Sequence, residues 1–453
     1  MQPQRTLSKF VCLAIGSYLR LARVLPLPEG RALLCLLVSM GSMPAWAFEQ
    51  IVVSQPQNGP VRLIQQAIQN HPDIAAARSE RRATEFEIDA ARNQFYPTPA
   101  AQLRQDKDGP STVVSLTQPL WTAGKLTAGL NAASSRAESA NMAIEEARYT
   151  LALRVVTAWT AYLQAHGRES AQRESVDLLN RYAESVSRRI LGGASADVDR
   201  ELVSARLAQA KSDLSAASTA RRVALVQLGQ LLGKQPTPED IPSRAGMAGP
   251  QSPEKLASLS ELIQLATNYS PALRRIDGNL EAARHDADKK RAALWPTINL
   301  RAEHQQNNST PNSINYRDKR VILALEYAPD AGLSTSANID AAESRIVGQG
   351  NTRESTRLNL VEKVQSDYED YLAGSDRAQN LQRTLEANIA VLASYERLLA
   401  AGKRTWLDVL NIARELTSAR SALSDTDTQR VAALYRICLH IGAVPFTSSG
   451  SPQ

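Results

Sequence analysis

Residues 397–411 read Arg397-Leu398-Leu399-Ala400-Ala401-Gly402-Lys403-Arg404-Thr405-Trp406-Leu407-Asp408-Val409-Leu410-Asn411. A helical pattern of apolar residues arrives at Gly402, stops, and starts again at about Thr405. Glycine adopts the left-handed conformation that often follows the last helical turn, because it has no Cβ atom to clash. Thr405 followed by Asp408 has the spacing of a capping box, in which each side chain satisfies a backbone N–H group of the new helix. The stretch therefore predicts the tip of a helical hairpin.

A second tip lies upstream, where residues 188–199 read Arg188-Arg189-Ile190-Leu191-Gly192-Gly193-Ala194-Ser195-Ala196-Asp197-Val198-Asp199. Other landmarks also recur: Pro72 and Pro97 return 199 residues later as Pro271 and Pro296, and Tyr162, Gly193 and Gly233 return 209 residues later as Tyr371, Gly402 and Gly442. A spacing that changes only once indicates an internal duplication with one insertion of 10 residues. The polar segment 305–315 is the expected place of that insertion.

Each copy follows the same predicted plan of a helix, two strands, a very long helix, a tip and a return helix. In the first copy the opening helix is expected over 63–92. The strands are expected over 98–105 with 112–121, and over 297–305 with 320–327; the long helices are expected over about 129–191 and 336–401. About 60 helical residues span roughly 90 Å, which no compact core needs. The alternating strand runs have the length of tilted membrane-spanning strands, although ordinary hairpins packed on the helices are an alternative.

The N-terminal segment has the features of a secretory signal peptide. Arg31 precedes a short apolar run, and Ala45-Trp46-Ala47 forms the small-residue end that is typical before cleavage, here before Phe48. Cys35 lacks the small residues that a lipoprotein box requires, so we expect no lipid anchor. After residue 47 no stretch is apolar enough for a transmembrane helix.

These patterns predict five parts. They are a signal peptide (1–47), a first repeat (48–233), a linker rich in proline and glycine (234–257), a second repeat (258–442) and a disordered tail (443–453). The chain has 453 residues and a net charge of +6. Five basic residues and one acidic residue lie within 1–47. Most of the positive excess therefore belongs to the signal, and it gives no argument for nucleic-acid binding.

The reactive side chains indicate neither an enzyme nor a metal protein. Beyond the signal, Cys438 is the only cysteine, so no intramolecular disulfide can form. The histidines are scattered without ligand spacing, and no nucleophile–base motif or phosphate loop is present. We therefore expect no cofactor, no metal and no catalytic residues.

The mature sequence resembles the TolC family of outer-membrane channel-tunnels along essentially its whole length. The resemblance rests on the two-copy plan and on four motifs, which are Asn70-His71-Pro72-Asp73-Ile74, Ser270-Pro271-Ala272-Leu273, Thr117-Gln118-Pro119-Leu120-Trp121 and the tip from Gly402 to Leu410. It implies a mixed α/β membrane protein with two internal repeats, in which a long α-helical coiled-coil barrel joins a transmembrane β-barrel shared by a homotrimer. Four strands per chain fit this, because open sheet edges are not tolerated in lipid.

The resemblance also implies a periplasmic gate at the tips. Arg404 matches a closing arginine, and Asp408 matches a carboxylate of the constriction. Asn411 stands where a second carboxylate is found, and Leu399 where an aromatic hydroxyl residue can occur, so the network departs from the family pattern. In the first copy Asp197 and Asp199 compete for the equivalent place. The expected surface for a periplasmic adaptor comprises Gly192, Gly193, Gly402, Lys403 and Trp406. Plain helix capping by Asp408 and a solvated Arg404 are the alternatives.

The implied function is that of the outer-membrane channel of a tripartite export system. It would extend into the periplasm of a Gram-negative cell and contact outer-membrane lipid. Type I protein (toxin) secretion with an ABC transporter and a periplasmic adaptor is the first interpretation, and the missing lipid box favours it. Multidrug or small-molecule efflux with another inner-membrane pump is the alternative. A soluble periplasmic coiled-coil adaptor or scaffold is an alternative of another class.

Overall fold

The computed structural model describes residues 59–106, 109–242, 257–307, 316–328, 332 and 334–444. The predicted signal peptide, most of the linker, most of the predicted insertion and nearly all of the tail lie outside these residues. The elements are α1 (Val61–Asn70), α2 (Pro72–Asn93), β1 (Thr98–Asp106), β2 (Gly109–Trp121), α3 (Lys125–Leu191), α4 (Asp197–Leu232), η2 (Pro238–Asp240), α5 (Leu259–Tyr269), α6 (Pro271–Ala292), β3 (Thr297–Asn307), β4 (Tyr316–Glu326), α7 (Thr335–Ala400) and α8 (Trp406–His440).

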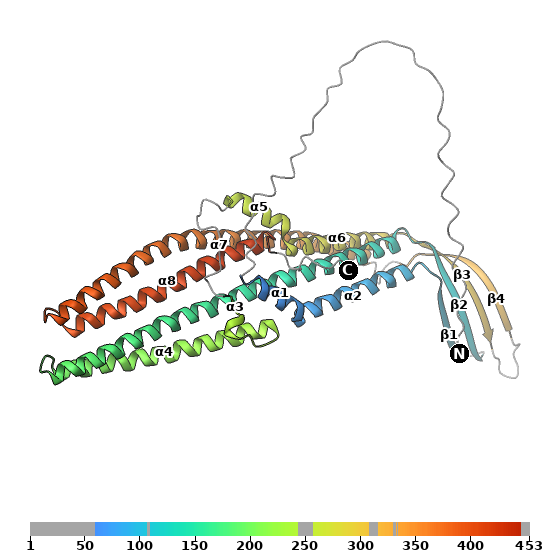
Figure 1. The fold of residues 1–453 in the computed structure, drawn as a ribbon. Helices are drawn as coiled ribbons and strands as arrows, with labels where there is room; N and C mark the ends of the chain where they lie inside the picture. The colour runs from blue at the N-terminus through green and yellow to red at the C-terminus, as the bar shows by residue number, and fades with distance from the viewer. Residues whose placement is uncertain are drawn as a thin grey trace, which may run out of the picture. The chain divides into compact units, whose positions relative to one another are not determined.

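The same order of elements occurs twice, as the duplication predicts. Two short helices lead into two strands, and a long helix with its return helix follows (Figure 1). The long helices α3 and α7 have 67 and 66 residues and begin close to the predicted positions. The prediction of two copies built from long helical hairpins and strand pairs is therefore confirmed.

The prediction of one opening helix of about 30 residues is wrong. The helix breaks at His71, whose backbone is extended, and α2 begins at Pro72. Proline has no N–H group to donate and disfavours a helical conformation at the residue before it. The His71 ring accepts a hydrogen bond from the Asp73 amide at 3.2 Å and so caps the new helix. The second copy breaks in the same way before Pro271, with Ser270 as the cap.

The four strands form one antiparallel sheet in the order β1-β2-β3-β4, so the pairing of β2 with β3 joins the two copies. The strands are longer than predicted at the ends that face away from the helices. β4 begins at Tyr316 instead of residue 320 and ends at Glu326, which leaves Tyr327 outside. The sequence shows no alternation of apolar and polar residues at this end, because the consecutive residues Arg317, Asp318 and Lys319 are all charged. Cross-strand pairing with β3 nevertheless extends through them.

The two faces of the sheet differ in polarity. Along β3, Leu300 and Ala302 lie on one face with Val114, Leu116, Val321, Leu323 and Leu325 of the neighbouring strands. Most of these side chains are exposed. On the opposite face Arg301 pairs with Glu326 at 2.9 Å and Glu303 with Arg320 at 2.7 Å. An exposed apolar face backed by a polar face is the pattern of a strand pair between lipid and a water-filled lumen.

The helix α3 packs against α1, α2, α4, α6 and α8, whereas α7 packs against α5, α6 and α8. Buried apolar residues form two clusters, one beside the short helices and one towards the hairpin tips. The tips of α3–α4 and α7–α8 lie at the helix ends remote from the sheet (Figure 1). In the described part of the chain, none of the helices combines the length and apolar character that a membrane-spanning helix needs.

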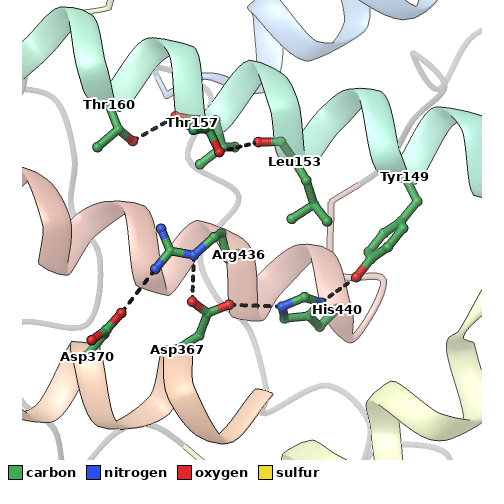
Figure 2. A network of polar contacts seen from close by, with 9 residues as sticks. Tyr149, Leu153, Thr157, Thr160, Asp367, Asp370, Arg436 and His440 are labelled. Carbon is green, nitrogen blue, oxygen red and sulfur yellow. Dashed lines mark hydrogen bonds and ion pairs between the residues drawn. The ribbon is translucent and has the colours of Figure 1, made fainter. Parts of the chain in front are cut away.

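A buried polar network joins α3, α7 and α8 within the first cluster (Figure 2). Asp367 is bound by the Arg436 guanidinium at 2.5 Å and by His440 Nε2 at 2.9 Å. The other ring nitrogen of His440 lies 2.6 Å from the Tyr149 hydroxyl. Burial, with the nearby Asp367 charge as a second cause, raises the pKa of Tyr149 above its usual value. The protonated hydroxyl can therefore donate to His440 Nδ1, while His440 Nε2 donates to Asp367.

Candidate functional site

The second tip is closed by two local hydrogen-bond motifs that the sequence predicts. Gly402 has a φ of +69°, and Lys403 N–H donates to the Leu398 carbonyl at 2.8 Å. Across the turn the Thr405 amide donates to Asp408 Oδ2 at 3.1 Å, and the Asp408 amide donates to Thr405 Oγ1 at 3.3 Å. The left-handed glycine after α7 and the capping box of α8 are both confirmed.

Arg404 and Asp408 lie together at this tip. The hydrogen bonds from Thr405, first from its backbone and then from its hydroxyl, lower the pKa of Asp408, and the nearby Arg404 charge adds to this effect. Asp408 is therefore ionised at neutral pH. The Arg404 guanidinium lies 3.9 Å from Asp408 Oδ2 and 4.5 Å from the centre of the Tyr395 ring. Both side chains remain partly exposed, so they can still act on neighbouring chains or ions.

The first tip repeats the glycine turn but lacks the capping box. Gly193 has a φ of +72°, and the Ala194 amide donates to the Arg189 carbonyl at 2.8 Å. The N-cap of α4 is Ala196, which has no hydroxyl to hold a carboxylate. Asp199 takes the third position of α4, as Asp408 does in α8. By position, Asp199 and not Asp197 corresponds to Asp408.

Asp197 has a different environment. Its carboxylate lies 3.2 Å from Arg200 on the same helix, and the side chain is largely exposed. Asn411 lies one turn beyond Asp408 and is half-buried. Four of the predicted gate residues thus lie at the starts of the two return helices, namely Asp197 and Asp199 in α4, and Asp408 and Asn411 in α8.

Three contacts across the hairpins hold the tips against each other, and sequence reasoning missed them. The Tyr182 hydroxyl donates to Glu396 Oε1 at 2.6 Å, which links α3 to α7. Arg189 donates to the Leu399 carbonyl at 3.1 Å. Trp406 Nε1 donates to Ser195 Oγ at 3.4 Å. Each partner lies more than 200 residues away in sequence, so no local pattern could have identified these pairs.

Trp406 is at the tip, as predicted, but its side chain is turned inward. Only 3% of the residue is exposed, and its ring packs edge-on against Tyr182 with the centroids 5.6 Å apart. In this conformation the indole ring contacts the other hairpin of its own chain and is not available to an adaptor. The remaining predicted contact residues, Gly192, Gly193, Gly402 and Lys403, are exposed.

The described residues contain no group of three or more His, Cys, Asp or Glu side chains that could hold a metal ion. Cys438 is buried and unbonded, and burial raises the pKa of its thiol to about 12. A thiol with so high a pKa is protonated at neutral pH and is a poor nucleophile.

Comparison with known proteins identifies the family. The family model described as outer membrane efflux protein matches twice, over residues 63–234 and 262–443. Protein CyaE of Bordetella pertussis is 25% identical over 324 residues, which cover 68% of this chain and 68% of that protein. Cobalt-zinc-cadmium resistance protein CzcC of Cupriavidus metallidurans is 23% identical, covering 77% and 81%. Alkaline protease secretion protein AprF of Pseudomonas aeruginosa is 23% identical, covering 65% and 62%.

A solved structure of the outer-membrane channel OprN has the same fold. It superposes with a TM-score of 0.72 at 19% sequence identity, over 84% of this chain and 90% of that one. The fold class inferred from the resemblance is thus confirmed. The family consists of outer-membrane channels of Gram-negative bacteria and not of enzymes, which rules out the alternative of a soluble periplasmic scaffold. The two matches of the family model together span most of the chain, so the chain belongs to the outer membrane efflux protein family, the family of TolC.

Proposed function

We propose that this outer-membrane channel of a tripartite export system serves type I protein secretion, with an ABC transporter and a periplasmic adaptor as its partners. The observation that carries the proposal is the similarity to AprF, whose name identifies it as a protein secretion component. A polypeptide requires a tip that opens widely. At the tips, the hydrogen bonds that join the two hairpins would have to break for such an opening.

Small-molecule or metal efflux is the second candidate. The similarity to CzcC, which is named for resistance to cobalt, zinc and cadmium, favours it. The two candidates differ in cargo, and both use the same outer-membrane position.

The test is complementation. A host that lacks its own channel is given this chain together with a type I transporter, an adaptor and their secreted protein, and separately with a metal or drug efflux pump. The proposal expects the secreted protein in the medium and no gain in metal or drug tolerance. Restored tolerance without secretion would favour efflux instead.

We further propose that three copies of the chain form one channel. The sheet has two open edges, β1 and β4, and open edges in lipid leave backbone groups without hydrogen bonds. Three sheets joined edge to edge give a closed barrel of twelve strands, with the polar face towards the lumen and the apolar face towards lipid.

The first prediction is the oligomeric state. Mass measurement of the purified protein in detergent should give three times the mass of one mature chain. A stable monomer, or a ring with an even number of chains, would contradict the shared barrel.

The tips are proposed to form the periplasmic gate and the adaptor-binding end. Three-fold symmetry would place three Asp408 carboxylates around the axis, with Asn411 one turn away and Asp199 contributing from the first copy. Asp197, which pairs with Arg200, is the less favoured candidate of the first tip. The exposed turn residues, chiefly Lys403, would contact the adaptor.

The second prediction separates Arg404 from Asp408 in planar bilayers. Asp408→Asn removes the ring charge but keeps the side-chain size, so cation selectivity and block by divalent cations should fall. Arg404→Ser removes a surface ion pair that contributes about 0–1 kcal/mol per chain, so conductance should rise modestly. Arg188→Ser is the matched control, because Arg188 is a largely exposed cation near the first tip. Unchanged selectivity in Asp408→Asn would mean that this residue is only a helix cap.

A further inference from the structure

The apolar face of the sheet becomes basic near its outer end, on strands β3 and β4. Along β4, Leu325, Leu323 and Val321 are followed on the same face by Lys319 and then Arg317. Lys319 pairs across the strands with His304, and Arg317 with Gln306. Both cations are exposed. Two positive charges thus continue a row of exposed apolar side chains.

These cations have no acidic partners within the described residues. The nearest acidic residues along the strands, Asp318 and Glu303, point to the opposite face by strand alternation, and Glu303 is bound there by Arg320 at 2.7 Å. His304 Nδ1 is covered by protein atoms and makes no hydrogen bond in the described structure. On the polar face, by contrast, Arg301 and Arg320 both pair with carboxylates. Among the described residues, the two cations of the apolar face thus lack the carboxylate partners that the cations of the polar face have.

An apolar groove lies directly beside the cations. Pro99, Val114, Leu116, Ala302 and Val321 line it together with His304 and Lys319, and Ser115, Glu303 and Arg320 also contribute to its lining. The groove crosses all four strands, because Pro99 is in β1 and Val321 is in β4. A partner that fills it must combine a hydrocarbon part with an anionic group.

The two ends of the strands carry different kinds of side chain, which also indicates that the sheet contacts lipid. Exposed aromatic residues collect at the end next to the helices, where Tyr96, Trp121, Trp295 and Tyr327 lie. Aromatic side chains are typical of a membrane–water interface. Because the helices extend into the periplasm, the opposite end, which carries Arg317 and Lys319, is in the outer leaflet.

We propose that Arg317 and Lys319 form a binding site for the phosphate of a phosphorylated lipid in the outer leaflet, with its acyl chains along the groove. The site rests on the proposed placement of the sheet in the membrane. Lysine and arginine bind phosphate by charge and by multiple N–H donors. The lipid would cover the basic end of the apolar face, with its phosphate on the two cations and its acyl chains on the apolar residues.

The experiment is native mass spectrometry of the purified trimer in a mild non-ionic detergent. Lipid A with two phosphates is the probe, and the same lipid with its phosphates removed is the comparison. Each cation near an anionic lipid surface should contribute about fivefold to affinity, so Lys319→Gln should lose about fivefold and Arg317→Gln/Lys319→Gln about twenty-five-fold. Lys319→Arg should keep the affinity.

Arg104→Gln is the matched control, because Arg104 is an exposed cation near the same end of the sheet but on the polar face. It should bind the phosphorylated lipid like the wild type. Equal binding of both lipid forms would overturn the site, because only apolar contact would remain. Equal losses in Arg104→Gln and Lys319→Gln would also overturn it, because the effect would then be one of overall charge.

The proposed membrane placement is tested separately by fractionation and by trimer mass for the same variants. If the chain fails to insert or to form trimers, the proposed function fails with it. If stable, inserted trimers show no preference for phosphate, the lipid site alone is wrong.

Discussion

Replacing Tyr182 with Phe is expected to raise the conductance of the channel in a planar bilayer severalfold or more. The substitution removes only the hydroxyl that donates to Glu396 at 2.6 Å, and the ring can still pack against Trp406. A hydrogen bond to a charged acceptor is stronger than one between neutral groups. The proposed gate contains this link in each of three copies, so about 1 kcal/mol per chain gives about 3 kcal/mol in favour of the proposed closed state. Their loss lowers the ratio of closed to open tips by roughly a hundredfold.

A double-mutant cycle with Glu396→Gln tests whether the effect belongs to this link. If Tyr182 and Glu396 act together, the double variant should open little more than either single variant. Arg188→Ser serves again as the control, since Arg188 makes only a weak 3.9 Å contact with Glu184 on its own helix. The gate proposal would be contradicted if Tyr182→Phe kept the wild-type conductance while the trimer remained intact.

Replacing Asp367 with Ala is expected to destabilise the helical part of the chain by about 3–5 kcal/mol per chain. Asp367 accepts from both Arg436 and His440, and its side chain is only 9% exposed. Without the carboxylate, the Arg436 charge and the His440 N–H group lose their partner in a buried site (Figure 2). The midpoint temperature for the loss of helical circular dichroism should fall by several degrees.

The chain offers a close control for this variant. Asp370 lies one turn further along α7, is 62% exposed, and contacts Arg436 only at 3.5 Å. Asp370→Ala should therefore change the midpoint little, as exposed ion pairs contribute about 0–1 kcal/mol. Equal effects of the two substitutions would show that the buried network does not stabilise the fold.

Features that depend on residues close together in the chain could be predicted without a structure. The glycine turns at Gly193 and Gly402 and the capping box of Thr405 with Asp408 each involve residues within about one helical turn. Such contacts form whenever the local backbone does, so the residue types alone predict them. The same local rules show that a helix breaks before Pro72. The expectation of one continuous helix was therefore wrong, although the information was present.

The repeat could also be found without a structure, because spacing is a property of the sequence. The constant offsets between proline and glycine residues indicate the two copies. The alternation of apolar and polar residues indicates the two faces of the strands. The strand ends were missed where Arg317 and Lys319 interrupt the apolar pattern. Their inclusion in β4 depends on hydrogen bonds to β3, which no short-range signal reports.

The side chains that meet across the helices could be identified only from the packing of the helices in three dimensions. An apolar heptad pattern indicates which face of a helix is buried, but it does not fix how one helix is rotated and shifted against another. The inward position of Trp406, the Tyr182–Glu396 link and the junction of Asp367 with His440 all depend on that relative placement. The choice of Asp199 over Asp197 depends on where α4 begins, and there the sequence offers two carboxylates and no capping hydroxyl. Short-range backbone chemistry could thus be predicted from the sequence, whereas contacts between helices required their packing in three dimensions.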